Sequence, residues 1–282
     1  MRVFVIFLAL ALGAPARAAV TTGIEYGRAD GESLKLDANV PDGPGPFAAV
    51  IIVHGGGWTR DDTPENCVPL FAPLSRAGFA WFAVKYRLAP AHRWPACLED
   101  VETAIRWVKA HAAEFHVDPA RIALLGESSG GQIVQMVAVR AVSADAPTRV
   151  AALVAFYAPC DNVADSVRRG GPSPSMQALL GIGDKLDAAA EARLREVSPL
   201  NFVHPHLPPC LLVHGTADQS VPYDQSLQWQ ARLKAHGIAC ELVTVAGAPH
   251  NMGKWETTPG LDLGYKDKLV AWLEKTLGPV KP

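Results

Sequence analysis

Hydrophobic residues occur in two different patterns along this chain. The segment 34–40 alternates apolar and polar residues, and a turn at Asp30-Gly31 separates it from a second strand-like stretch at 24–28. Alternation with a period of two is typical of strands that bury one face. These two stretches therefore predict an antiparallel hairpin at the start of the folded chain.

From residue 48 onward, the alternation gives way to short continuous apolar runs, which suit strands buried on both faces. These runs are 49–53, 79–84, 122–125, 151–156, 211–213 and 242–245. Between them lie stretches with helical spacing, clearest at 98–108, where apolar residues recur every three or four positions. Alternating strands and helices predict the α/β class, with a mostly parallel central sheet flanked by helices.

The domain organisation follows from length and continuity. The 282 residues contain no internal repeat and no linker that would separate two domains, so we expect one domain over 19–282. One segment interrupts the alternation, the Pro- and Gly-rich stretch 160–205 between two predicted strands. It is either a small cap over the functional site or a surface insertion.

The N-terminus predicts export. Arg2 precedes an apolar run at 3–12, and small residues flank Arg17 at the positions that a signal peptidase inspects. We interpret residues 1–18 as a signal peptide, because the run is shorter than the ~20 apolar residues that cross a bilayer. The mature protein is then expected in the periplasm or secreted, without stable membrane insertion.

Composition excludes several classes of function. The formal net charge of -2 leaves no basic surplus for phosphates, so nucleic acid is not an expected partner. The five cysteines lack the close pairs of metal or redox motifs, and their odd number leaves at least one thiol unpaired. We expect buried structural cysteines, no metal site and no cofactor, while the oligomeric state stays open.

The strongest chemical signal is a Gly-x-Ser-x-Gly motif. Gly126-Glu127-Ser128-Ser129-Gly130 directly follows a predicted strand and precedes a helical run. Glycines allow a tight strand-to-helix turn that exposes the central hydroxyl, and the helix N-terminus favours negative charge beside it. This context predicts Ser128 as a nucleophile.

A second glycine-rich element follows the strand at 49–53. His54-Gly55-Gly56-Gly57-Trp58 lets the backbone fold closely enough to donate N–H groups to an oxyanion. We expect the donors to be the amides of Gly56 or Gly57 together with that of Ser129. The alternative is a tight turn without chemistry.

A serine nucleophile needs a base and an acid that orients the base. His250 lies in a loop after the last apolar run, and Asp218 follows the run at 211–213, which gives the order Ser128, Asp218, His250. Asp161, which also follows a strand, is the alternative acid. We expect Glu127 to order the surrounding loops rather than to transfer protons.

A substrate pocket is harder to predict. Trp58 is a candidate substrate-binding residue, and Met176, Leu179 and Leu180 are candidate lining residues that could equally belong to the core.

With these residues assembled, the chain resembles the α/β-hydrolase esterases over about residues 45–255. The segment from Tyr86 to Asp100, with Arg-Leu-Ala-Pro and Trp-Pro-Ala, is similar to the hormone-sensitive-lipase-like esterases. The stretch 208–222 is more similar to the feruloyl and acetyl-xylan esterase group. Two positions depart from the pattern: Ser129 replaces the usual Ala, and Asp61 stands where Gly often follows the glycine-rich loop.

The resemblance implies a serine hydrolase that cleaves small carboxylic esters through an acyl-enzyme and needs no cofactor. We expect activity to fall at acid pH, because a protonated imidazole cannot act as a base. Two alternatives share the scaffold: an amidase, formamidase or small peptidase, and a non-catalytic binding protein. The sequence favours short acyl chains but does not choose between a sugar ester, a lipid and a xenobiotic.

Overall fold

The computed structural model describes residues 19–61, 63–143 and 145–278, so the predicted signal peptide lies outside the described residues. Its centre is an eight-stranded sheet of order β1-β2-β4-β3-β5-β6-β7-β8. The strands are β1 (Thr21–Ala29), β2 (Glu32–Asn39), β3 (Phe47–Val53), β4 (Ala80–Val84), β5 (Val117–Glu127), β6 (Ala152–Phe156), β7 (Cys210–Gly215) and β8 (Cys240–Val245).

The predicted hairpin and the predicted parallel sheet are both confirmed. β1 pairs antiparallel with β2, and β2 pairs antiparallel with β4. All further neighbours from β4 to β8 are parallel. β5 begins at Val117, five residues before the predicted run. Val117 pairs with Phe47 across a register shift, and the intervening Asp-Pro-Ala-Arg at 118–121 interrupts the apolar run in the sequence.

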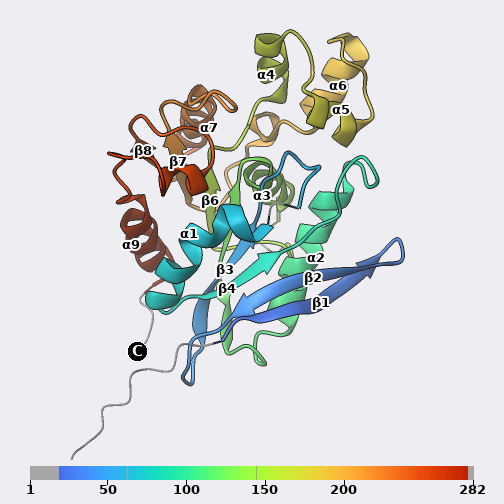
Figure 1. Ribbon diagram of the computed structural model, residues 1–282. Coiled ribbons are helices and arrows are strands. Elements are labelled where there is room, and N and C mark those ends of the chain that lie inside the picture. The colour runs from blue at the N-terminus through green and yellow to red at the C-terminus, as the bar shows by residue number, and fades with distance from the viewer. Residues whose placement is uncertain (1–18, 62, 144, 279–282) are drawn as a thin grey trace, which may run out of the picture.

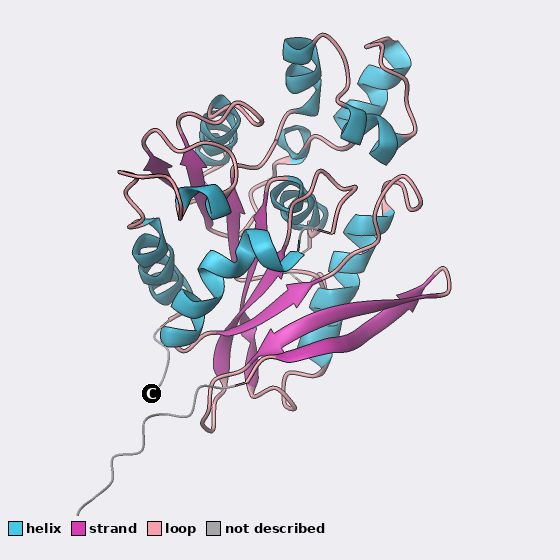
Figure 2. Ribbon diagram, in the orientation of Figure 1, coloured by secondary structure: helices cyan, strands magenta, loops and turns pink. Residues whose placement is uncertain are grey.

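Helices cover both faces of the sheet (Figure 1, Figure 2). They are α1 (Thr63–Arg76), α2 (Ala96–Ala110), α3 (Ser129–Arg140), α4 (Asn162–Arg169), α5 (Pro174–Leu180), α6 (Ala188–Glu196), α7 (Asp224–Ala235), α8 (Met252–Trp255) and α9 (Tyr265–Leu277), with a 3₁₀ turn at Pro199–Phe202.

The alternation of side chains along each buried strand creates two cores. In β3, Ile51 packs with residues of α2 and α3, whereas its neighbour Ile52 packs with residues of α1 and α9. The helix predicted at 98–108 is α2, and its buried face includes Leu98 and Val101. A continuous apolar run in the sequence therefore corresponds to a strand that is covered on both sides.

The segment 160–205, called the cap segment below, folds into three short helices. Figure 1 shows α4, α5 and α6 at the top of the molecule, beyond the ends of the central strands. Side chains cap all three helices: Asp161, Ser173 and Asp187 accept hydrogen bonds from backbone amides of the first turn. Local capping thus stabilises helices that are too short to persist alone.

All five cysteines are buried and none forms a disulfide in the structure. Cys210 and Cys240 lie opposite each other on β7 and β8, where both side chains fill the core. Among the described residues, no helix has both the length and the apolar character needed to cross a bilayer.

Candidate active site

The nucleophile turn, residues 126–130, connects β5 to α3 through a sterically demanding backbone. Ser128 has φ 52° and ψ −121°, a conformation that non-glycine residues rarely adopt. A Cβ atom at Gly126 would lie 2.3 Å from the carbonyl oxygen of Gly130, and one at Gly130 would lie 2.2 Å from that of His54. The two glycines therefore permit the turn that presents the Ser128 hydroxyl.

Ser128 lies at the end of a continuous hydrogen-bonded chain. Its Oγ is 2.9 Å from Nε2 of His250, and Nδ1 of His250 is 2.6 Å from Oδ2 of Asp218. A carboxylate only accepts, so Nδ1 carries the proton and Nε2 is free to accept one from Ser128. The structure thus brings together the three residues that the sequence predicts as nucleophile, base and acid.

Asp218 is held by four donors in a fully buried position. Its Oδ1 accepts the backbone amides of Ser220 (2.8 Å) and Val221 (2.9 Å). Burial alone would raise the pKa of this carboxyl, but the hydrogen bonds from His214 and His250 and the charge of His250 hold its pKa well below the ordinary value. Asp218 therefore stays ionised and can stabilise an imidazolium.

His214 is a second histidine on the same carboxylate. Its Nε2 lies 3.0 Å from the carbonyl oxygen of Val221 and 3.4 Å from Oδ2 of Asp218, and its Nδ1 lies 2.7 Å from Oγ of Ser226. A carbonyl oxygen only accepts, so Nε2 carries the hydrogen and Nδ1 accepts from Ser226. The buried ring thus donates to the Val221 carbonyl oxygen and lies beside Asp218, whose pKa it helps to lower.

The glycine loop, residues 54–58, lies beside the nucleophile turn. Gly56 and Gly57 have φ values of 99° and 61°, which suit glycine. Among the described residues, the backbone amides of Gly56, Gly57 and Ser129 donate to no protein acceptor. Gly57 and Ser129 both line the pocket that contains Ser128, so their amides are candidate donors to an oxyanion there.

Two buried side chains hold the glycine loop in place. Oε1 of Glu127 accepts the amide of Gly55 at 2.5 Å, and the Tyr86 hydroxyl lies 3.0 Å from the carbonyl oxygen of His54. The Tyr86 ring also stacks on His54 with ring centroids 4.3 Å apart. Glu127 therefore orders the loop, in agreement with the interpretation of its sequence position.

The pocket that contains Ser128 is small, with a volume of about 170 Å³. Trp58 and Met176 line it, and the indole of Trp58 donates to Gln132 at 3.0 Å. Leu179 and Leu180 belong to the same buried core as Trp58 and Met176 but do not line the pocket. Of the four apolar candidates from the sequence, two thus lie at the pocket.

Asp161, the alternative acid, has a different position. Its Oδ1 accepts the amides of Val163 and Ala164, so it forms the N-cap of α4. Its side chain accepts hydrogen bonds from the first turn of this helix, whereas the side chain of Asp218 contacts His250.

The family follows from a family model that matches most of this sequence. The BD-FAE family model matches residues 36–233, about 70% of the chain. The chain belongs to the BD-FAE family. The matched range contains Ser128 and Asp218, and His250 lies beyond its end.

Relatives of this BD-FAE domain are esterases. The chain is 29% identical over 231 residues to esterase LipQ of Mycobacterium tuberculosis, covering 79% of this chain and 54% of LipQ. It spans about half the length of the curated relatives it matches first.

Two solved structures share the fold over nearly their whole length. A truncated carbohydrate esterase from gut microbiota superposes with a TM-score of 0.78 at 26% identity, covering 93% of this chain and 98% of that chain. Esterase 2 of Thermogutta terrifontis with bound propionate gives a TM-score of 0.73 at 26% identity, covering 94% and 96%. The α/β-hydrolase architecture expected from the sequence is thus shared with known esterases.

His214 is a residue of this BD-FAE site to which the sequence alone assigned no role. It lies four positions before Asp218, at the end of β7, and the His-Gly pair there reads as an ordinary strand end. The four-residue spacing between His214 and Asp218 carries no signal in the sequence by itself. The two side chains come together only because of how the loop after β7 folds.

Proposed function

We propose that this protein is a serine esterase that hydrolyses small carboxylic esters. The observation that carries the proposal is the chain of hydrogen bonds from Ser128 through His250 to Asp218. Ser128 attacks the ester carbonyl while His250 accepts its proton, and Asp218 stabilises the resulting imidazolium. The amides of Gly57 and Ser129 donate to the oxyanion of the tetrahedral intermediate.

The intermediate collapses when His250 returns the proton to the departing alcohol. This leaves an ester between the acyl group and Ser128. A water molecule then attacks this acyl-enzyme, His250 accepts its proton, and the carboxylic acid is released with Ser128 restored. His250 therefore acts as base and acid in turn at the same nitrogen, Nε2.

Short acyl groups suit this pocket best. Its volume of about 170 Å³ is far below that of sites for drug-sized ligands, which hold about 300–1,000 Å³. The related Thermogutta terrifontis esterase binds propionate. We further propose that residues 1–18 direct export, so that the enzyme meets its esters in the periplasm or outside the cell.

The test is hydrolysis by the purified protein lacking residues 1–18. The panel contains p-nitrophenyl acetate, butyrate and octanoate, with Ser128→Ala as the matched control. We expect acetate or butyrate to be hydrolysed best, and the activity to vanish in the variant. A fluorophosphonate should add mass at Ser128 in the wild type alone.

Two results would contradict the proposal. Activity that survives Ser128→Ala would show that Ser128 is not the nucleophile. Labelling of Ser128 without hydrolysis of any ester, but with cleavage of matched amides, would instead make the protein an amidase.

A further inference from the structure

One wall of the pocket above Ser128 is formed by the cap segment and carries charge. Helix α4 contributes Asp165 and Arg169 to the pocket lining, and Ser173 and Ser175 follow from the start of α5. Apart from His250, Asp165 and Arg169 are the ionisable residues among the described side chains that line this pocket. The esterase mechanism leaves both without a role.

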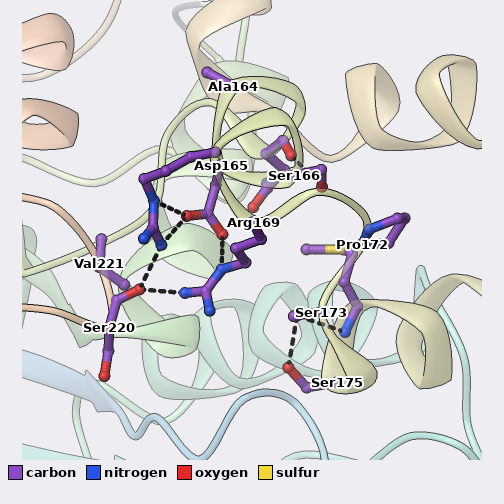
Figure 3. A network of polar contacts seen from close by, with 12 residues as sticks. Ala164, Asp165, Ser166, Arg169, Pro172, Ser173, Ser175, Ser220 and Val221 are labelled. Atoms are coloured by element: carbon purple, nitrogen blue, oxygen red, sulfur yellow. Dashed lines mark hydrogen bonds and ion pairs between the residues drawn. The ribbon is translucent and has the colours of Figure 1, made fainter. Parts of the chain in front are cut away.

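Arg169 is held in one orientation by the protein. Its Nε donates to Oδ2 of Asp165 at 2.7 Å, and its Nη2 donates to the carbonyl oxygen of Ser220. Figure 3 shows both contacts and the guanidinium between them. The amide of the same Ser220 donates to Asp218, so the wall is joined to the loop of the catalytic acid.

The guanidinium keeps hydrogen-bonding capacity for a ligand. An arginine has five N–H groups, and the contacts to Asp165 and Ser220 use Nε and Nη2. Within the described part of the chain, Nη1 of Arg169 has no protein acceptor. Because the side chain is already fixed, little further conformational entropy is lost when a ligand binds.

The wall also carries a surplus of positive charge. Arg168 donates to the same carboxylate, with its Nη2 2.7 Å from Oδ1 of Asp165. Two guanidinium groups thus share one carboxylate, which leaves one positive charge uncompensated within this cluster. Arg168 itself does not line the pocket, whereas Arg169 does.

We propose that Arg169 forms an anion subsite in the active-site pocket, and that the enzyme prefers esters carrying a carboxylate on the part that lies against α4. This proposal rests on the proposed esterase function. A carboxylate matches the planar guanidinium, and hydrogen bonds between charged groups are about twice as strong as neutral ones. The charge of Asp165 does not oppose binding, because the two arginines already offset it.

The test compares kcat/KM within matched pairs of esters. One pair places the charge on the alcohol, with 4-acetoxybenzoate against its neutral counterpart 4-acetoxybenzamide. The other places it on the acyl group, with the p-nitrophenyl monoester of glutarate against p-nitrophenyl pentanoate. The preference is the charged-to-neutral ratio within a pair, so differences in intrinsic reactivity cancel when variants are compared.

Three variants separate the subsite from a general effect of charge. Arg169→Gln should lower the preference in at least one pair by about tenfold, which corresponds to about 1.4 kcal/mol. Arg169→Lys should recover part of it. Arg168→Gln is the matched control, because it removes a guanidinium that contacts the same carboxylate but does not line the pocket. It reduces the positive charge of the cluster only, so its preference should fall by no more than about threefold, clearly less than in Arg169→Gln.

The outcomes are distinguishable. If Arg169→Gln has the same charged-to-neutral ratio as the wild type in both pairs, the subsite is overturned. It is also overturned if Arg168→Gln lowers this ratio as much as Arg169→Gln does. Hydrolysis of p-nitrophenyl acetate without hydrolysis of either charged ester would also overturn the subsite. If the wild type hydrolyses neither p-nitrophenyl acetate nor any of the four esters, the esterase function itself fails.

Discussion

The nucleophile turn and the cap segment meet at one pocket but are built in opposite ways. In the nucleophile turn, backbone sterics determine the geometry, since a side chain at Gly130 would meet the backbone of β3 and the strained Ser128 is locked between strand and helix. In the cap segment, short helices are fixed by capping residues and by pairs of charged side chains such as Asp165 with Arg169.

This difference separates reactivity from selectivity. A buried, sterically determined backbone can hold Ser128 and the amide donors without rearrangement during the reaction. Side chains on a partly exposed helix can change in sequence without disturbing that geometry. The comparison therefore predicts that equivalent substitutions in the two regions have very different effects.

The largest expected contrast is between two acids, Asp218 and Asp165. Asp218→Asn should lower kcat for p-nitrophenyl acetate by about 10⁴-fold, because the amide no longer holds His250 in the required tautomer. Asp165→Asn, which neutralises an acid of the cap segment, should change kcat for this neutral ester by less than about tenfold. Steady-state kinetics on both variants measures the difference, and similar losses would remove the distinction between the regions.

The Asp218→Asn variant also tests whether Asp218 is ionised in the folded wild type. Because the pKa of Asp218 is lowered in the folded protein, its ionised form adds stability above the unfolded value of about 3.9, and this stability is lost as pH falls through the folded pKa. The wild type should therefore exceed Asp218→Asn in free energy of unfolding near neutral pH, and the gap should shrink below about pH 4. Urea unfolding at several pH values would show this, and a gap that widens toward acid pH would contradict it.

The second contrast concerns glycine. Gly130→Ala should destabilise the protein by about 3 kcal/mol, because the new Cβ would lie 2.2–2.3 Å from carbonyl oxygens of His54 and Val53. Gly183→Ala in the cap segment meets no atom within 4 Å and should change stability by less than about 0.5 kcal/mol. Thermal unfolding of both variants is the measurement, and equal shifts in Tm would show that the nucleophile turn relaxes more readily than its geometry implies.

The same contrast explains what could be predicted from the sequence. Sterically determined turns leave strong local signals, so the motif around Ser128 and the glycines at 55–57 can be recognised from residue types alone. The parallel sheet follows because continuous apolar runs require burial on both faces. Ser128, Asp218 and His250, although far apart in sequence, lie together because each follows a strand whose carboxyl end reaches the same edge of the sheet.

In the cap segment, the sequence contains weaker signals of which residues reach the pocket. Arg169 is one of many arginines in the sequence, and only the fold of α4 against the loop of Ser220 gives it a place in the pocket. Leu179 and Met176 look alike in sequence and both belong to the buried core, yet of the two only Met176 also lines the pocket. Such contacts depend on how a helix is rotated against the rest of the chain, which apolar periodicity alone does not determine here.

A smaller contrast compares two acids that accept backbone amides, Glu127 at the end of β5 and Asp187 at the N-cap of α6. Glu127→Gln replaces a charged acceptor of Gly55 by a neutral one and should lower kcat by about tenfold, because the glycine loop is held less firmly. Asp187→Asn makes the same kind of change at the N-cap of α6 and should leave kcat within about twofold. Rates on p-nitrophenyl acetate decide this, and an unchanged kcat in Glu127→Gln would mean that the loop does not need a charged acceptor at this position.

The smallest expected effect concerns Asp161, the residue that competes with Asp218 in the sequence. As the N-cap of α4, it should contribute about 1 kcal/mol to stability, and Asp161→Ala should remove this contribution with little change in kcat for p-nitrophenyl acetate. Because fraying of α4 would loosen Arg169, the preference for carboxylate esters should fall while the reaction itself continues. Urea unfolding together with the paired-ester ratios tests both parts. A large loss of kcat in Asp161→Ala would instead tie the cap segment to the chemical step, and the separation of reactivity from selectivity would not hold.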